Sequence, residues 1–158
     1  MPEQRQFSPD RMLWSFALVG AVPGLDFNSI DLRPGLVRGP QVAGGQSDPD
    51  WTMAHDDGGN AEYTFNPAHN AGQLSFTYLY GAITNSLLSA LVLADRQTKL
   101  CVGTIQGKDL NGQTLIVGRG ARLQGMPDIG FGLTANQRTW TFLIADLNYF
   151  AGALEVIG

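Results

Sequence analysis

The sequence has a single cysteine, Cys101, so a disulfide within the chain is excluded. A secreted disulfide scaffold and a thiolate zinc site are both disfavoured for the same reason. Charge is also scarce, because charged residues make up 15% of the chain against about 25% in an average soluble domain. A small protein with so little charge tends to associate, so the composition favours a chain that is buried among partners.

Basic residues are the minority of the charges. Ten Lys and Arg oppose 14 Asp and Glu, which gives a formal net charge of -4. Proteins that grip phosphates carry a basic surface, so stable nucleic-acid binding is disfavoured. No run approaches the roughly 18 apolar residues of a membrane span, and the polar first ten residues lack the apolar region of a signal peptide. We therefore expect a soluble protein with no membrane partner.

The length of 158 residues fits one domain, which we place over residues 1–158. A flexible N-terminal arm is expected at 1–10. Residues 34–60 are rich in Gly, Pro and Asp and are predicted to form a long inserted loop. Loops longer than about 12–15 residues are unusual in compact domains and generally have a function or are disordered on their own.

Much of the remaining chain alternates apolar and polar residues with the period of a β-strand. The expected strands cover 13–19, 25–32, 63–65, 73–80, 100–108, 113–123 and 138–147. The third and fourth are expected to pair through a turn at 66–71. Asn111 and Gly112 suit a type I′ turn between the fifth and sixth. The predicted fold class is mainly β: an antiparallel sandwich or barrel with one flanking helix.

The one predicted helix begins near Ile83, where Thr84 or Asn85 is expected to cap the first turn. Apolar residues fall on one face at helical spacing. Val92 lies roughly opposite Ile83 at about 100° per residue, so the helix is apolar on a second side as well. Such a helix is expected to have a neighbour beyond its own sheet.

The strongest candidates for chemistry lie in the acidic loop and its neighbours. They are His55, Asp56 and Asp57, with Asp48, Asp50 and His69 nearby in the sequence. Their spacing matches neither a calcium loop nor a zinc-binding helix, so a solvated acidic loop is the preferred interpretation. The sequence also lacks a nucleophile elbow and a phosphate-binding glycine loop. We expect no enzyme activity, no cofactor and no metal, and Cys101 is expected to be a core residue.

From Ala82 onward, a series of residues occurs in a recognisable order. A helix carries Asn85, Leu88, Ser89, Ala90 and Leu91 and ends at Asp95; a hairpin carries Lys108, Asp109, Leu110, Asn111, Gly112 and Thr114; then come Met126, Pro127 and Asp128 with Phe131 and Gly132; and Arg138, Thr139, Trp140 and Thr141 lead to Ala145, Asp146, Leu147 and Gly152. This order resembles the tail tube proteins of long-tailed bacteriophages. A weaker likeness upstream involves Asp56 to Gly59. Residues 33–50 depart from the family by being longer and richer in Gly and Pro.

The resemblance implies a β-sandwich or barrel with a flanking helix, six copies of which close into a ring with a continuous β-barrel as its inner wall. Stacked rings would form the tail tube through which DNA is ejected. The implied partners are identical copies, with sheath, baseplate and terminator proteins as further neighbours, while DNA and the tape-measure protein pass through transiently. The implied location is the virion tail, after synthesis in the host bacterial cytoplasm.

Three sets of residues are candidates for this assembly. The ring-interface helix would use Leu88, Val92 and Leu93, and the ring-stacking loop Pro34, Gly39, Gly44, Trp51, Asp56 and Asp57. A contact repeated by rotation closes a ring, and one repeated along an axis makes a filament. Gln73, Ser75 and Thr77 are lumen candidates, although they could equally be the wet face of any antiparallel sheet.

Other functions remain open. A tail terminator, a head-tail connector or a bacteriocin tube protein would share the fold. A small carbohydrate-binding β-sandwich would use exposed Trp51, Tyr63 or Tyr149 as a sugar platform. An enzyme that depends on His55 or Asp57 is the third alternative.

Overall fold

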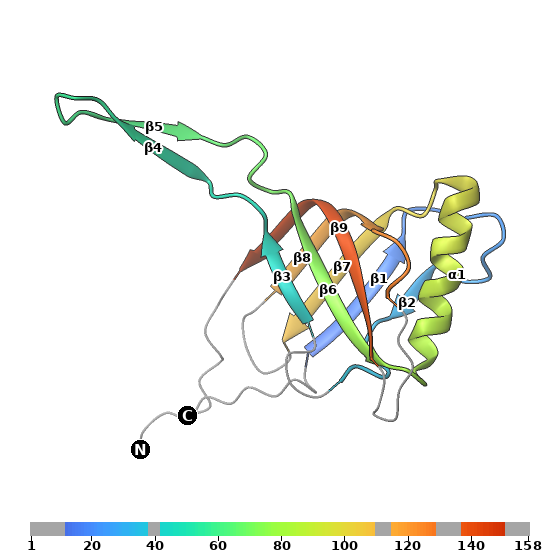
Figure 1. Cartoon of the computed structure of the whole chain (residues 1–158). Coiled ribbons are helices and arrows are strands. Elements are labelled where there is room, and N and C mark those ends of the chain that lie inside the picture. The colour runs from blue at the N-terminus through green and yellow to red at the C-terminus, as the bar shows by residue number, and fades with distance from the viewer. Residues whose placement is uncertain (1–11, 38–41, 110–114, 129–136, 151–158) are drawn as a thin grey trace, which may run out of the picture.

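The structure is a computed structural model that describes residues 12–37, 42–109, 115–128 and 137–150. Its nine strands and one helix are β1 (Met12–Leu18), β2 (Ser29–Asp31), β3 (Val42–Gln46), β4 (Trp51–His55), β5 (Ala61–Phe65), β6 (Gly72–Leu79), α1 (Ile83–Thr98), β7 (Gly103–Asp109), β8 (Leu115–Leu123) and β9 (Gln137–Phe150). Seven strands form one sheet in the order β2-β1-β7-β8-β9-β6-β3, and all neighbours are antiparallel. The predicted fold class is confirmed (Figure 1).

The large sheet curls until its distant strands face one another across the core. β1 and β6 are four strands apart, a distance of roughly 19 Å in a flat sheet with about 4.8 Å between strands. The ring centroids of Trp14 on β1 and Phe76 on β6 nevertheless lie 5.3 Å apart. The concave face therefore encloses a core of aromatic and aliphatic side chains, including Phe16, Phe142 and Ile105.

The segment 32–37 closes the curled sheet because it is bonded to both sides of the opening. The Leu32 N–H donates to the Trp14 carbonyl on β1, and the Val37 N–H donates to the Thr77 carbonyl on β6. The buried Tyr78 hydroxyl adds a 2.7 Å hydrogen bond to the Leu32 carbonyl. Burial raises the pKa of this phenol, so it remains a hydrogen-bond donor. The result is a barrel.

The helix α1 covers one end of the core and buries Thr84, Leu88, Leu91, Val92 and Ala94. The predicted cap is wrong: α1 begins after Ala82, which makes no side-chain cap. Instead, Thr84 Oγ1 donates to the Pro34 carbonyl at 2.8 Å, and the Asn85 side chain bonds to β6 and β9 residues and the turn after β6. The Thr84 and Asn85 side chains therefore bond to distant parts of the chain and do not cap the first turn of the helix.

The strand pairs were only partly predictable. The hairpin of β7 and β8 is confirmed, although its Asn111-Gly112 turn lies outside the described residues. The pairing of 63–65 with 73–80 is wrong, because β5 pairs with β4 while β6 lies between β3 and β9. The segment 34–60, predicted as a loop, contains β3 and β4. The predicted N-terminal extension at 1–10 and the C-terminal residues 151–158 also lie outside the described residues.

Candidate assembly surfaces

A two-stranded ribbon projects from the barrel between β3 and β6 (Figure 1). We call residues 47–66 the arm; it consists of β4, β5 and the turns at its tip and base. Every residue from Ser47 to Phe65 is exposed. An isolated two-stranded hairpin is at best marginally stable in water, because too little apolar surface is buried to offset the ordering of the chain. We therefore expect the arm to be stabilised by contact with the surface of another molecule.

The register of the arm gives it one apolar face. Trp51 pairs with Phe65 and Met53 with Tyr63, while Thr52 pairs with Thr64. Side chains alternate along a strand and paired residues share a face, so the two aromatic-rich pairs lie together. Their exposed fractions run from 46% for Phe65 to 64% for Tyr63. We call Trp51, Met53, Tyr63 and Phe65 the apolar face of the arm.

At the base of the arm, aromatic contacts connect the ribbon to the turn that follows it. The rings of Trp51 and Phe65 lie 5.1 Å apart, and those of Phe65 and His69 4.8 Å apart. His69 Nδ1 lies 3.0 Å from the Asn66 carbonyl oxygen. His69 thus belongs to the base of the arm, whereas His55 lies at the far end of β4. The two histidines among the candidates for chemistry are therefore not brought together.

The tip of the arm is a tight acidic turn. Asp56 accepts hydrogen bonds from the Asn60 side chain at 2.9 Å and from the Asn60 N–H at 2.8 Å. These bonds favour the ionised carboxylate and lower the pKa of Asp56. Asp56 is therefore a turn-forming residue, and Asp57 beside it is exposed. In the part of the chain that the structure describes, no group of three or more His, Cys, Asp or Glu side chains could hold a metal ion.

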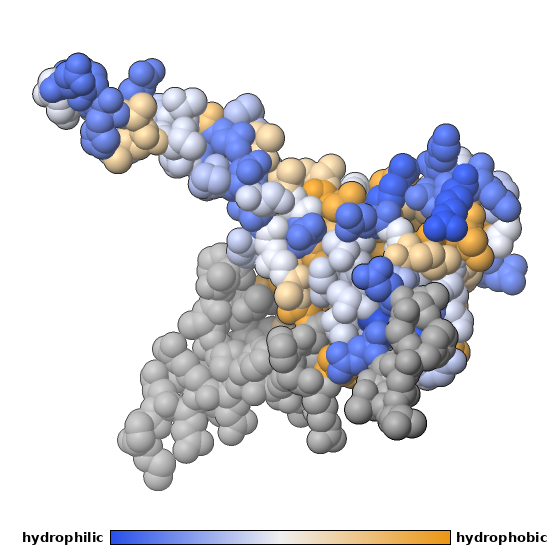
Figure 2. Space-filling view, viewed as in Figure 1, coloured by the Kyte–Doolittle hydropathy of each residue, from blue (hydrophilic) through white to orange (hydrophobic). Residues whose placement is uncertain are grey.

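The arm carries the negative charge of the protein. It contains five of the 14 acidic residues and none of the ten Lys and Arg, so the rest of the chain has nine acids and ten bases. The acidic residues of the arm are Asp48, Asp50, Asp56, Asp57 and Glu62. Its tip forms a strongly hydrophilic end in Figure 2. The partner surface that fits the arm is therefore both apolar and basic.

Where the arm joins the barrel, the paired strands β3 and β6 leave no room for a side chain at Gly44. Gly44 on β3 has a φ of 139°, and a Cβ added there would collide with the Gln73 carbonyl oxygen on β6. Gly44 was a stacking-loop candidate, but it lies inside a strand. Pro34, another candidate, lies beside α1, where its carbonyl accepts from Thr84. Gly39 lies outside the described residues.

The predicted ring-interface helix needs correction. Leu88 and Val92 have exposed fractions of 0% and 4% and belong to the core of the subunit, so they are not available for a ring contact. One wide stripe of α1 faces the core, and the helical spacing alone suggested two separate apolar faces. Leu93, in contrast, is 52% exposed.

Near the end of α1, apolar and basic side chains occur together. Leu93 and Arg96 are three residues apart and share a face of the helix, and exposed Lys99 and Leu100 follow it. Arg122 of β8 donates from Nη2 to the Lys99 carbonyl at 2.9 Å. We call these five residues the helix corner. Figure 2 shows hydrophobic and strongly hydrophilic atoms side by side over this part of the molecule.

The outer face of the sheet is polar and uncharged along β6. Ser75 Oγ lies 3.1 Å from Thr141 Oγ1, and Thr77 Oγ1 lies 3.1 Å from Thr139 Oγ1 on β9. Gln73 is exposed. The three lumen candidates therefore share the face opposite the core, as their spacing predicted, and two of them form hydroxyl pairs with β9. Whether this face lines a lumen stays a prediction.

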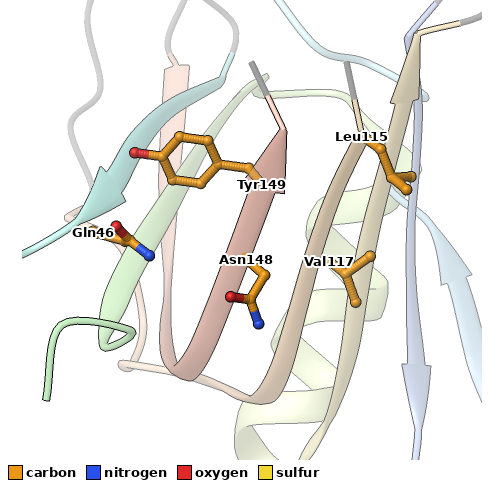
Figure 3. A pocket seen from close by; sticks show the side chains of 5 residues that line it. All are labelled: Gln46, Leu115, Val117, Asn148 and Tyr149. Atoms are coloured by element: carbon orange, nitrogen blue, oxygen red, sulfur yellow. The ribbon is translucent and has the colours of Figure 1, made fainter. Parts of the chain in front are cut away.

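The aromatic residues considered as a sugar platform are divided between two places. Trp51 and Tyr63 share the apolar face of the arm. Tyr149 lies near the end of β9, where it lines an open depression of about 430 Å³ with Gln46, Leu115, Val117 and Asn148 (Figure 3). The depression is wide and shallow, unlike the enclosed pockets that hold small ligands.

Cys101 is buried, and burial together with the nearby Asp95 carboxylate raises the pKa of its thiol. A raised pKa lowers the thiolate fraction and so the reactivity of the residue. Its placement in the core is as predicted. Among the described residues, no helix is long and apolar enough to cross a membrane.

Comparisons with known proteins find solved structures with a similar fold. No family profile and no curated sequence matches the chain. The solved sheath/tube terminator of an extracellular contractile injection system, PVC, in its extended state, has a TM-score of 0.57 at 11% identity, over 94% of this chain and 99% of that one. The cap of the anti-feeding prophage, described as a tube terminating cap, has a TM-score of 0.56 at 10% identity, over 95% and 94% of the two chains. At these identities the likeness shows a shared fold.

Sequence reasoning missed that the arm is a hairpin, although a signal was present. Trp51 and Met53 alternate with small residues before the acidic turn, and Tyr63 and Phe65 do so after it, with Gly58 and Gly59 between them. Such a pattern around a Gly-containing turn is typical of a hairpin. The high Gly, Pro and Asp content around it concealed the pattern.

Proposed function

We propose that this protein forms a ring at the end of the tube of a contractile injection system or a phage tail. The observation that carries the proposal is the likeness in fold, over nearly the whole length of both chains, to one protein described as a tube terminator and one described as a tube terminating cap. A tube subunit, which the sequence alone favoured, would share this fold and is the competing assignment.

The need for partners supports the proposal independently of the comparison. The arm has an apolar face that stays exposed in the part of the subunit that the structure describes, and it bears a tip of like charges. Among the described strands, β3 is an edge strand that pairs on one side only. Exposed edges are ready templates for pairing with another chain, and natural monomers cover or charge them. Here β3 carries no charged residue, as expected of an edge that is covered in an assembly.

The stoichiometry follows from the sequence resemblance, which implies six copies in a ring. In this arrangement the ring would bind the last ring of the tube and adjoin the sheath. Trp51, Asp56 and Asp57, which the sequence assigned to ring stacking, all lie on the exposed arm, so they stay candidates for a contact between subunits, within a ring or between rings. We expect the protein in the virion tail or the injection particle, after synthesis in the bacterial cytoplasm.

The proposed role is passive and needs no cofactor. Gln73, Ser75 and Thr77 would face the channel. Neither β6 nor β3 contains a charged residue, so a wall built from these strands would neither bind phosphates tightly nor repel them. Such a wall lets DNA or another charged cargo pass without being held.

Electron microscopy of the purified full chain, with mass photometry over a range of protomer concentrations, tests the proposal. The expected result is a single ring of six copies that does not elongate at high concentration. Long tubes would instead identify a tube subunit and overturn the terminal assignment. A protein that remains a monomer at every concentration would overturn both.

A further inference from the structure

We propose that the arm of one copy docks on the helix corner of the next copy in the ring. The inference rests on the proposed ring and adds the pair of surfaces that would close it. The apolar face of the arm would pack on Leu93 and Leu100, and the acidic tip would lie against Arg96, Lys99 and Arg122.

The contact has to form between copies. The arm leaves the barrel on the side away from α1 and points away from the body, so it cannot reach its own helix corner (Figure 1). With about 3.4 Å per residue, the ribbon from Trp51 to His55 is about 17 Å long before the tip is added. This is long enough to lie across the end of a neighbouring helix.

Charge complementarity identifies the occupant. The arm has five acids and no Lys or Arg, whereas the helix corner holds three bases around a single acid, Asp95. Pairing of two arms would instead bring ten acidic residues together, and a phosphate backbone or an anionic membrane would be repelled. Opposite potentials steer two surfaces into one register and disfavour other partners.

The apolar residues would provide most of the affinity. Exposed ion pairs contribute little each, because water and salt screen them. Buried aromatic side chains, by comparison, dominate binding at protein interfaces. Trp51 and Tyr63 on the arm, and Leu93 and Leu100 at the helix corner, are all more than half exposed in the single subunit. Covering them removes apolar surface from water on both sides.

The geometry of the pair suits a closed ring. The two surfaces are different, so the contact is heterologous: each copy gives its arm to one neighbour and receives an arm from the other. A heterologous contact repeated by rotation closes when the last arm reaches the first helix corner. Every arm and every helix corner is then covered, so neither of these two surfaces stays exposed in the ring.

Charge reversal tests this pairing. The arm variant is Asp57→Lys with Glu62→Lys, which leaves the turn-forming Asp56 intact, and the corner variant is Arg96→Glu with Lys99→Glu. All four positions are exposed, so each subunit should still fold. The protomer concentration at which half the protein is in rings, measured by mass photometry, should rise about tenfold for either variant.

The decisive variant carries all four reversals in one chain. Each interface then joins a basic arm to an acidic helix corner, so assembly should return to within about threefold of the unmodified protein. Lys108→Glu with Arg119→Glu makes the same change in net charge as the corner variant at exposed positions on β7 and β8. This control should assemble normally. Trp51→Ala should weaken assembly by roughly 30-fold or more.

The outcomes separate this inference from the proposed function. If the unmodified protein forms rings but the charge variants and the control assemble equally well, the arm serves another partner and the inference is overturned. The inference is also overturned if the variant with all four reversals assembles no better than the arm variant and the corner variant. If the unmodified protein forms no rings, the proposed function fails and the inference fails with it.

Discussion

Replacing Asn85 by Ala should destabilise the subunit far more than its position in the first turn of a helix suggests. The Asn85 amide donates to the Leu79 carbonyl at 2.8 Å and to the Tyr80 carbonyl at 3.2 Å. Its side-chain oxygen accepts the indole N–H of Trp140 at 2.9 Å. One side chain thus joins α1, the turn before it and β9.

The magnitude follows from what the substitution leaves behind. Trp140 is 2% exposed, so its N–H loses its partner at a largely buried position. An unsatisfied buried donor costs about 1–3 kcal/mol, and the two lost donations about 1 kcal/mol more. Alanine's higher helix propensity offsets about 0.6 kcal/mol. The net loss in the free energy of unfolding should be about 1.4–3.4 kcal/mol, or roughly 3–14 °C in Tm for a chain of this size.

Urea and thermal denaturation measure this loss, at one protomer concentration for all variants because assembly stabilises the folded state. Ser86→Ala, at the next and exposed position of the same helix, is the matched control and should change the free energy of unfolding by less than about 0.5 kcal/mol. In a Trp140→Phe background the indole N–H is already absent, so Asn85→Ala should cost about 1–2 kcal/mol less. Equal costs in both backgrounds would refute the bond as the cause.

Three further predictions concern the core, the junction and the tip of the arm. Leu88→Ala should lower the free energy of unfolding by about 2–5 kcal/mol, because Leu88 is fully buried, whereas Leu93→Ala should change it by less than about 0.5 kcal/mol; equal urea midpoints would contradict this. Gly44→Ala should force β3 away from the Gln73 carbonyl and speed hydrogen exchange of β3 amides, while Gly20→Ala, which meets nothing within 4 Å, should not. The lowered pKa of Asp56 stabilises the tip turn above the ordinary Asp pKa of about 3.9, and this stabilisation is lost as the pH falls through the lower folded value. The Asn60 amide NMR signal should report this change at acidic pH, and Asp56→Asn should remove it.

The sequence predicted the strands wherever one face is buried in the core. Trp140, Phe142 and Ile144 alternate with exposed or half-buried residues, and the burial of β9 follows that alternation. The hairpin of β7 and β8 was predictable because a turn of known chemistry fixes its ends. Local signals of this kind need no knowledge of the rest of the chain.

Other features depend on distant contacts that periodicity does not contain. The pairing of β6 with β3 and β9 joins segments far apart in the sequence, so adjacency along the chain led to the wrong partner. The burial of Leu88 and Val92 depends on how wide a stripe of α1 the barrel covers. A substitution to Asp at either position would therefore unfold the subunit, rather than selectively weaken a ring. The sequence identified the acidic segment that contains the arm. The apolar face of the arm could be recognised only from the register of β4 and β5.

The way the arm is rooted determines how it yields under load. Its two sides continue into β3 and β6, which are paired neighbours, and the Gln46 and Gly72 pair lies closest to the root. Tension on the tip would therefore pull β3 and β6 in the same direction, so the load would pass to the ladder between β6 and β9 that holds them to the sheet. Since β3 has no strand on its other side among those described, it could peel away while β6 stays held by β9. A load on the arm would then reach the barrel through the hydrogen-bonded β6 strand, and not through the helix or the core.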